Sequence, residues 1–189
     1  LLPSVFSIFS SLFPGLTLTE IIIRAESWKE YLNLALLFLI MIKEKSAGAI
    51  LFRIEEGVKY LLLYKKASGH YREAWDFPKG NVEASENEEQ TAEREAKEET
   101  GLESINLIPK FKEKIQFFYR RGIDSVYKTV IFLLAETKDK DVKVSEEHND
   151  YKWCNYEESL NLLTHKNSKE ILNKANNFLK EHLKQKRLA

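Results

Sequence analysis

The sequence predicts an α/β (α+β) fold in which helices pack on a mixed β-sheet. Three observations support this prediction: two apolar runs joined by Glu56-Gly57, an acidic segment with helix-capping signals, and a C-terminal region whose apolar residues have helical spacing. The chain has 189 residues, of which 43% are hydrophobic. A chain of this size can bury one sizeable core and is too short for two ordinary domains. We therefore expect one globular domain.

Four segments rich in apolar, β-branched or aromatic residues predict the strands. The first two flank Glu56-Gly57, which is typical of a tight turn, so they are expected to form a hairpin. The last two flank the sequence RRGIDS, and the charged run KDKDVK that follows them predicts a solvated turn. The predicted strands cover residues 47–55, 58–65, 105–119 and 127–136.

Helices are expected in two regions. Ser85 and Glu88 fit a capping box, and Gly101 is placed to end the same helix in the left-handed conformation, which predicts a helix of about four turns. Residues 156–163 and 168–183 also have helical spacing. The apolar stripe of the second segment consists of Ile171, Leu172, Ala175, Phe178, Leu179 and Leu183.

Residues 1–40 are interpreted as a hydrophobic N-terminal extension, and residues 41–189 as the domain itself. A membrane-spanning helix needs roughly 20 apolar residues, and Arg24, Glu26 and Lys29 interrupt the stretch that has this length. The positive charge that precedes the apolar region of a signal peptide is missing. Three interpretations stay open: upstream sequence outside the domain, an appended amphipathic helix and, least favoured, a membrane anchor.

The charge balance and the cysteine content narrow the function classes. The chain has 29 basic and 29 acidic residues, so counterion release alone gives it no general affinity for DNA. Cys154 is the only cysteine, which excludes an intramolecular disulfide and a Cys-based zinc site. We expect Cys154 to be a buried small hydrophobe and the protein to be cytoplasmic. No obligate protein partner is evident, and membrane contact is not expected.

Eight glutamates crowd the segment from Gly80 to Leu102. On a helix, Glu95, Glu98 and Glu99 stand at positions i, i+3 and i+4 and project from one face. Their mutual repulsion costs stability unless a cation lies there. The segment is therefore either a solvated acidic face or a site for a hard cation such as Mg²⁺ or Mn²⁺.

The spacing of the whole segment favours the second interpretation. Gly80, five residues, Glu86, seven residues and then REAKEETGL resembles the Nudix box, G-x5-E-x7-R-E-U-x-E-E-x-G-U, where U is a bulky aliphatic residue. One position departs from the pattern, because Ala96 is small where a larger aliphatic residue is preferred, and this removes no ligand. The resemblance implies a Nudix α/β/α sandwich with a central mixed sheet. It also implies hydrolysis of a nucleoside diphosphate linked to another group.

The implied chemistry agrees with the residues taken alone. A polyphosphate repels a water nucleophile, so divalent cations, Mg²⁺ or Mn²⁺, must neutralise phosphoryl oxygens and lower the pKa of bound water. By the resemblance, Arg94 orients Glu95, which acts as a ligand or base, and Glu86 reaches the metal through water or pairs with Arg94. The implied metal ligands are Gly80 through its carbonyl, Glu86, Glu95, Glu98 and Glu99.

A second stretch narrows the resemblance. YKTVIFLLAETKDKDVKVSEEHNDYKW, residues 127–153, is similar to asymmetrical diadenosine tetraphosphate hydrolases, a Nudix subfamily that forms ATP and AMP. The similarity implies that Lys128 binds polyphosphate, that Phe117 replaces a tyrosine that stacks on adenine, and that Glu147 supports catalysis. Lys79, directly before the box, is a candidate for phosphate contact, and Tyr127 is a further candidate for stacking.

Other functions stay open. The first is a Nudix pyrophosphohydrolase acting on RNA 5′-triphosphate ends or other nucleoside diphosphate derivatives; RNA would need a basic path for a single strand. The second is a catalytically silent Nudix-fold nucleotide-binding module, which is disfavoured because no box carboxylate is missing. His70 and His148 are interpreted as surface polar residues. The candidate basic path consists of Lys110, Lys112, Lys114, Arg120 and Arg121.

Overall fold

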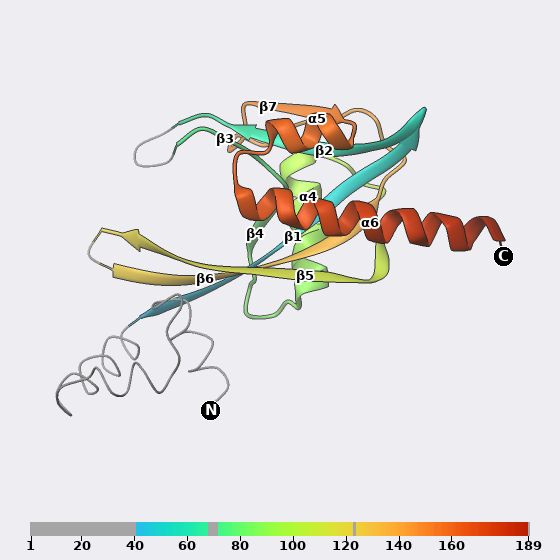
Figure 1. Ribbon diagram of the computed structural model, residues 1–189. Helices are drawn as coiled ribbons and strands as arrows, with labels where there is room; N and C mark the ends of the chain where they lie inside the picture. The colour runs from blue at the N-terminus through green and yellow to red at the C-terminus, as the bar shows by residue number, and fades with distance from the viewer. Residues whose placement is uncertain (1–40, 68–71, 123, 189) are drawn as a thin grey trace. The chain divides into compact units, whose positions relative to one another are not determined.

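Figure 1 shows the computed structural model, which describes residues 41–67, 72–122 and 124–188. The expectations for residues 1–40 and for His70 lie outside the described residues. The described strands are β1 (Ile42–Glu55), β2 (Gly57–Lys65), β3 (Ala74–Asp76), β4 (Lys79–Asn81), β5 (Asn106–Arg121), β6 (Asp124–Glu136) and β7 (Asp150–Cys154). The described helices are α4 (Glu88–Thr100), α5 (Tyr156–Leu162) and α6 (Lys166–Leu188).

The strands form one mixed sheet with the order β3-β2-β1-β6-β5, to which β4 adds beside β1 and β7 beside β2. The predicted hairpin joins β1 and β2 in antiparallel register, with Glu55 opposite Gly57. Strands β1 and β6 run in the same direction, because Glu44 contacts Lys128 near their beginnings and the Phe52 carbonyl accepts the Thr137 N–H near their ends. The predicted mixed sheet is thus confirmed.

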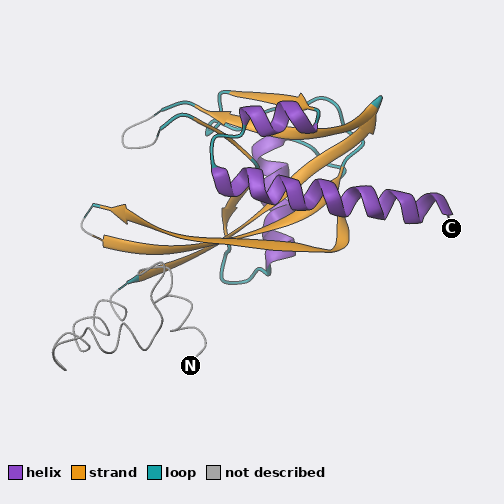
Figure 2. Ribbon diagram, viewed as in Figure 1, coloured by secondary structure: helices purple, strands orange, loops and turns teal. Residues whose placement is uncertain are grey.

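Alternate residues of the central strands face two different layers of helix. Leu51 and Leu61 pack in one cluster with Ala96 of α4, whereas Ile50 packs in another cluster with Leu172 of α6. This alternation follows from the two-residue period of a strand. Figure 2 shows α4 on one side of the sheet and α5 and α6 on the other. The sequence-based prediction of an α/β/α sandwich is confirmed.

Helix α6 buries most of its predicted apolar stripe. Ile171, Leu172, Ala175 and Leu179 are each at most 2% exposed, and they pack against the sheet. Cys154 is fully buried, as the sequence predicted. Within the described part of the chain, no helix combines the length and the apolar character that a membrane crossing requires.

Three strands were not predicted. Strands β3 and β4 have only three residues each, too few to show an alternating pattern, and they flank the turn within WDFPKG. Strand β7 does alternate, since Asp150 and Lys152 are exposed whereas Tyr151 and Trp153 are partly buried. That alternation was a signal that could have identified it. Strand β1 also begins earlier than predicted, at Ile42.

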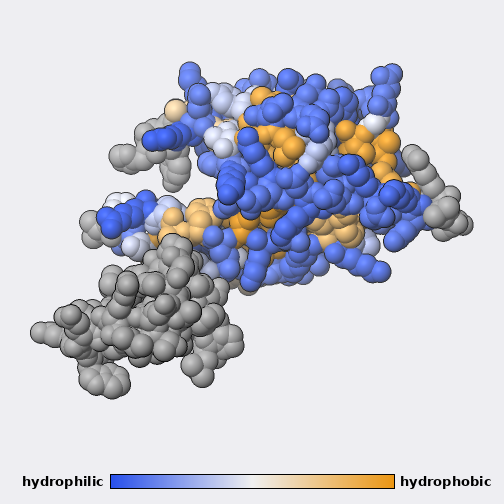
Figure 3. Space-filling view, viewed as in Figure 1, coloured by the Kyte–Doolittle hydropathy of each residue, from blue (hydrophilic) through white to orange (hydrophobic). Residues whose placement is uncertain are grey.

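The surface of the domain is largely polar. Hydrophilic residues cover most of the face drawn in Figure 3, with hydrophobic residues in limited areas. Among the described residues, the exposed large hydrophobic side chains are Ile54 and Phe117, at 52% and 37% exposure. Phe117 belongs to β5, a strand that borders the candidate site.

Candidate active site

Strand β4 brings Gly80, the first residue of the box, against the helix that carries the box glutamates. Gly80 pairs with Ala47 of β1, which fixes β4 to the sheet. A Cβ atom at position 80 would lie 1.9 Å from Oε1 of Glu95. The Glu95 carboxylate therefore rests directly on the Gly80 backbone, and a larger residue would displace it.

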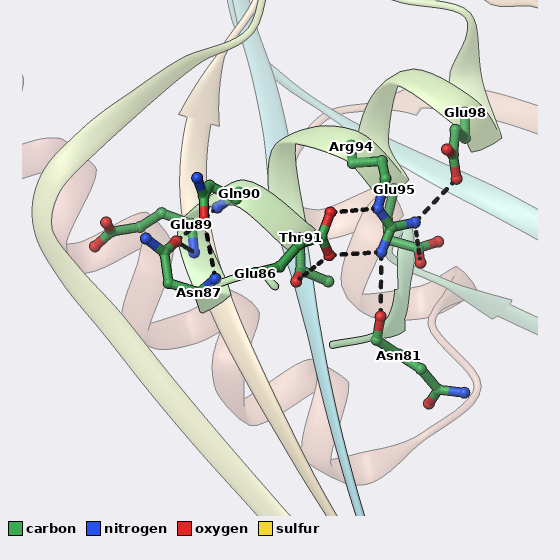
Figure 4. Close-up of polar contacts among 9 residues, drawn as sticks. All are labelled: Asn81, Glu86, Asn87, Glu89, Gln90, Thr91, Arg94, Glu95 and Glu98. Carbon is green, nitrogen blue, oxygen red and sulfur yellow. Dashed lines mark hydrogen bonds and ion pairs between the residues drawn. The ribbon is translucent and has the colours of Figure 1, made fainter. Parts of the chain in front are cut away.

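The start of α4 places Glu86 outside the helix. The prediction that Ser85 caps this helix is wrong, because Asn87 is the cap. Its Oδ1 accepts from the Gln90 N–H at 2.9 Å, and the Gln90 side-chain oxygen accepts from the Asn87 N–H at 3.0 Å. Glu86 precedes this cap, so its side chain can turn back along α4 (Figure 4). At the other end, Gly101 adopts φ 68° and ends the helix as predicted.

Arg94 is the centre of a network of carboxylates (Figure 4). Its guanidinium donates to both oxygens of Glu86 at 2.7 and 2.9 Å, to Glu95 at 2.8 Å and to Glu98 at 3.0 Å. It also donates to the Asn81 carbonyl at 3.1 Å, which ties α4 to β4. The hydrogen bonds from Arg94 lower the pKa of Glu86 to about 2. The expected contacts of Arg94 with Glu95 and Glu86 are therefore present.

Among the carboxylates of α4, Glu99 is buried and Glu95 is partly buried. Burial raises the pKa of Glu99 to about 8, and the nearby charges of Glu95 and Glu147 act in the same direction. Burial likewise raises the pKa of Glu95, whose side chain is 14% exposed. The Lys79 backbone N–H donates to Oε2 of Glu99 at 3.0 Å, which fixes that carboxylate at the beginning of β4. Both groups hold their protons more tightly than ordinary glutamates, so a cation beside them would favour their ionised forms.

The donor set suits a hard divalent cation. Glutamate oxygens and a backbone carbonyl are ligands that Mg²⁺ and Mn²⁺ accept, and the close fit of Glu95 on Gly80 brings these two donors together. Glu98 is 59% exposed and directed to Arg94. Within residues 41–67, 72–122 and 124–188, no three His, Cys, Asp or Glu side chains are gathered closely enough to hold a metal ion by themselves. The fit thus rests on the donor types and on the low exposure of Glu95 and Glu99.

Lys79 lies beside this cluster, but its ammonium is engaged elsewhere. Its Nζ donates to Asp76 Oδ2 at 2.8 Å and to the Phe77 carbonyl at 3.4 Å. Asp76 did not feature among the candidate residues. An acidic residue three positions before a candidate phosphate-binding lysine is the signal that could have identified it.

A second cationic group reaches the site from β6. Lys128 Nζ donates to Asn81 Oδ1 at 2.9 Å and to Glu44 at 3.1 Å. A residue distant in sequence from the box therefore contacts β4, the strand that carries Gly80 and Asn81. Phe117 is directly opposite Lys128 in the β5–β6 register and therefore shares its face of the ribbon. The structure brings Lys128 and Phe117 together as a cation and an exposed ring. Glu44 was missed because the predicted first strand began only at Ala47.

Tyr127 lies on the other face of the same ribbon. It is opposite Phe118, and their ring centroids are 4.8 Å apart. Because neighbouring residues of a strand point to opposite faces, Tyr127 points away from the face that carries Lys128. The arrangement does not bring Tyr127 together with the other candidate residues, and its stacking role stays a prediction.

The loop after β6 places Glu147 and His148 near the end of α4. The Ser145 N–H donates to the Glu99 carbonyl at 3.2 Å, which anchors the loop to that helix. Glu147 is exposed, pairs with Lys65 at 3.0 Å and contributes to the raised pKa values of Glu95 and Glu99. His148 is partly buried, and burial lowers its pKa to about 4. Glu147 is thus within electrostatic reach of the cluster.

Comparisons with known proteins agree with this arrangement. A family model described as the NUDIX domain matches residues 43–175. The asymmetrical bis(5'-nucleosyl)-tetraphosphatase of Mus musculus is 34% identical over 146 residues, which cover 71% of this chain and 95% of that protein. The enzyme of the same description from Caenorhabditis elegans is 32% identical over 138 residues, which cover 71% of this chain and 96% of that protein.

A solved structure gives the same result. The crystal structure of a C. elegans Ap4A hydrolase binary complex superposes with a TM-score of 0.62 at 31% identity, covering 73% of this chain and 98% of that one. Residues 43–175, which the family model matches, include β4, α4 and the loop with Glu147, and these elements carry the carboxylates described above. The chain therefore belongs to the NUDIX family and is a Nudix hydrolase.

Proposed function

We propose that this protein is an asymmetrical dinucleoside tetraphosphatase, which hydrolyses diadenosine tetraphosphate to ATP and AMP. In this reaction a water oxygen bonds to the phosphorus next to one adenosine. The bond from that phosphorus to the bridging oxygen breaks, and ATP leaves. The observation that carries the proposal is the hydrogen bond from Lys128 Nζ to Asn81 of β4. Phe117, whose ring is exposed, is directly opposite Lys128 on the neighbouring strand β5. The relatives at 32–34% identity bear this activity in their names.

The residues proposed to hold the divalent cation are Glu95, Glu98, Glu99 and the carbonyl of Gly80. A bound Mg²⁺ or Mn²⁺ supplies charge neutralisation of the phosphoryl oxygens and lowers the pKa of water. Arg94 keeps Glu95 and Glu98 close together through bonds of 2.8 and 3.0 Å, which offsets part of their repulsion. Glu86 holds Arg94 in place through two bonds and is proposed to reach the cation only through water.

The other candidate residues are proposed to act on the substrate. The Lys128 ammonium is placed to bind a phosphate of the chain, and the Phe117 ring offers a stacking surface for an adenine, worth about 1–3 kcal/mol in comparable stacks. Phe117 has no hydroxyl, so the stack by itself selects weakly among bases. Glu147, which is exposed and within electrostatic reach of Glu95, is proposed as a general base or as a group that orients water.

The test is hydrolysis of diadenosine tetraphosphate by the full chain with Mg²⁺ in ¹⁸O-labelled water, beside a Glu98→Gln variant. The expected products are ATP and AMP, with the label in AMP only, and turnover lost in the variant. Two molecules of ADP, or label in ATP, would contradict the proposed position of attack. A protein that is folded and binds Mn²⁺ but does not turn over this substrate would contradict the proposed substrate.

The alternative of an RNA 5′ end has weaker support in the structure. Two residues of the candidate basic path are engaged in ion pairs, because Arg121 pairs at 2.7 Å with Glu44, which Lys128 shares, and Lys112 pairs with Glu88 at 3.2 Å. A path for single-stranded RNA needs accessible positive charge. Release of pyrophosphate from 5′-triphosphorylated RNA, without turnover of diadenosine tetraphosphate, would reverse this preference.

A further inference from the structure

The Lys79 ammonium is held by a carboxylate that belongs to neither the box nor the candidate substrate surface. Asp76 Oδ2 accepts from Lys79 Nζ at 2.8 Å, and the two side chains are only 17% and 33% exposed. A partly desolvated ion pair of this kind is screened less than a surface pair. Loss of one partner therefore leaves an uncompensated charge.

Asp76 is itself held in place from two directions. Its Oδ1 accepts from the Ser168 hydroxyl at 2.8 Å and from the Phe77 N–H at 3.0 Å. Burial opposes the ionisation of Asp76, but the charge of Lys79 and these donors outweigh it, so its pKa lies below the ordinary value. Ser168 belongs to α6, so the helix on one face of the sheet fixes a carboxylate that controls Lys79.

Lys79 has little freedom except at its ammonium. Its backbone N–H donates a hydrogen bond to the Glu99 carboxylate, and in the sheet Lys79 is paired with Gly48 of β1. A Cβ atom at Gly48 would lie 2.5 Å from the Cβ of Lys79, which shows how closely the two strands approach. The carboxylate of Glu99 also attracts the Lys79 ammonium electrostatically. Two carboxylates, Asp76 and Glu99, therefore compete for one ammonium, and Asp76 is the one that binds it.

We propose that Asp76 is a positioning residue that retains the Lys79 ammonium and so keeps the Glu99 carboxylate available to a divalent cation. Without the Asp76 charge, the ammonium would be free to pair with the ionised form of Glu99, the other carboxyl group that attracts it, and a metal ion would have to displace it. The proposal rests on the cation site of the proposed function, and it concerns residues outside the box. It predicts that Asp76 acts on metal affinity only through Lys79.

The test is a double-mutant cycle on metal affinity. Mn²⁺ binding to the full chain is measured by calorimetry, without substrate, for the wild type, Asp76→Asn, Lys79→Gln and the double variant. Asp76→Asn is expected to weaken Mn²⁺ binding by about tenfold, which is the lower end for partners of metal ligands. In the Lys79→Gln background, the same Asp76→Asn change is expected to alter the affinity by less than about twofold.

A matched control separates this effect from a general loss of negative charge. Glu93 lies on the exposed part of α4 and pairs with Lys97 at 2.9 Å, so Glu93→Gln removes one negative charge from the helix that carries Glu99 and leaves the pair of Lys79 with Asp76 intact. Mn²⁺ affinity is expected to stay within about twofold of the wild type. Circular dichroism and thermal melting establish that every variant is folded.

The outcomes separate the inference from the proposed function. If Asp76→Asn weakens Mn²⁺ binding equally with and without Lys79, or does not weaken it at all, Asp76 has no positioning role. If the folded wild type fails to bind Mn²⁺, the proposed cation site itself is wrong, and the inference falls with it. Restored affinity in the double variant, relative to Asp76→Asn alone, supports competition by the ammonium.

Discussion

At position 80, a methyl group would occupy space that belongs to the Glu95 carboxylate. A Cβ atom there would lie 1.9 Å from Oε1 and 2.2 Å from Oε2 of Glu95. We predict that Gly80→Ala lowers kcat by about 100-fold or more, because a displacement near 1 Å in a site of this kind has that effect. The fold should persist, since the exposed Glu98 and the Arg94 network can adjust. Steady-state kinetics with circular dichroism check this.

Gly57 provides the matched control for Gly80→Ala. It lies in the β1–β2 turn with φ 130°, and nothing lies within 4 Å of a Cβ built there. Gly57→Ala is expected to lower the free energy of unfolding by about 1–3 kcal/mol through backbone strain, with kcat of the folded protein unchanged. If both variants lost activity in proportion to their stability, crowding of Glu95 would not be the cause.

Arg94 illustrates why charge alone is not sufficient at a single residue. Its fork contacts Glu86, Glu95 and Glu98 at once, which a lysine ammonium cannot reproduce. Arg94→Lys is therefore predicted to lower kcat/KM by about 10–100-fold and to weaken Mn²⁺ binding, although the charge is retained. Lys97→Gln, which breaks only the exposed pair with Glu93, should leave both measurements unchanged. Unimpaired Arg94→Lys would show that the network does not order the site.

At the scale of elements, long periodic segments were predictable and short or competing ones were not. Strands β1, β2, β5 and β6 and helices α5 and α6 were expected near their observed places from the spacing of their apolar residues, and α4 was expected from its capping signals. The cap of α4 was misassigned, since Ser85 and Asn87 both fit a capping pattern and only packing decides between them. The outcome matters for the site, because it leaves Glu86 outside the helix.

The residues of the candidate site also divide into those that local sequence could predict and those that depend on contacts between distant segments. The box glutamates and Arg94 could be named because their chemistry depends on spacing along one helix. Glu44 and Asn81 could not, because each becomes important only through a contact made across the sheet, whereas the spacing of Asp76 to Lys79 was a signal in the sequence. Tyr127 is adjacent to Lys128 in sequence but lies on the opposite face of the strand, and its stacking role stays a prediction.

The loop from residue 137 to residue 149 should be sensitive to acid. Burial, followed by the charges of Lys65 and Lys79, lowers the pKa of His148 from 6.5 to about 4, and Glu147 and Asp76 only partly oppose this. Between pH 6.5 and 4 the unfolded chain therefore binds a proton at His148 that the folded protein does not, so the free energy of unfolding falls as pH falls through this range.

His148→Gln is predicted to flatten that part of the pH profile. The change in the free energy of unfolding between pH 7 and pH 4.5 should be smaller in the variant than in the wild type, as measured by urea titration at each pH. Above pH 7 the two profiles should run parallel, because His148 is neutral in both states. His165, an exposed histidine directly before α6, supplies the control: His165→Gln should leave the slope unchanged. Equal slopes for all three proteins would contradict the assignment to His148.

For the whole molecule, the sheet separates a layer that carries the chemistry from a layer that supports it. Leu102 is 1% exposed and packs with Ala96 beneath the box helix, whereas Leu172 is fully buried under α6 on the other face. Truncation of either leucine to alanine should cost about 2–5 kcal/mol of unfolding free energy. Because the two residues lie in separate clusters, the two costs should add within about 0.5 kcal/mol in the double variant.

Mn²⁺ affinity should distinguish the α4 layer from the α6 layer, although the losses of stability are similar. At a temperature at which both single variants are folded, Leu102→Ala is predicted to weaken Mn²⁺ binding, because it loosens the helix that positions Glu95, Glu98 and Glu99. Leu172→Ala should leave Mn²⁺ affinity within about twofold of the wild type, since Ser168 and its bond to Asp76 lie one turn away along α6. Chemical denaturation gives the stability terms, and calorimetry gives the affinities. Equal loss of affinity in both variants would mean that the two layers act as one unit, and that α6 controls the cation site through more than the contact between Ser168 and Asp76.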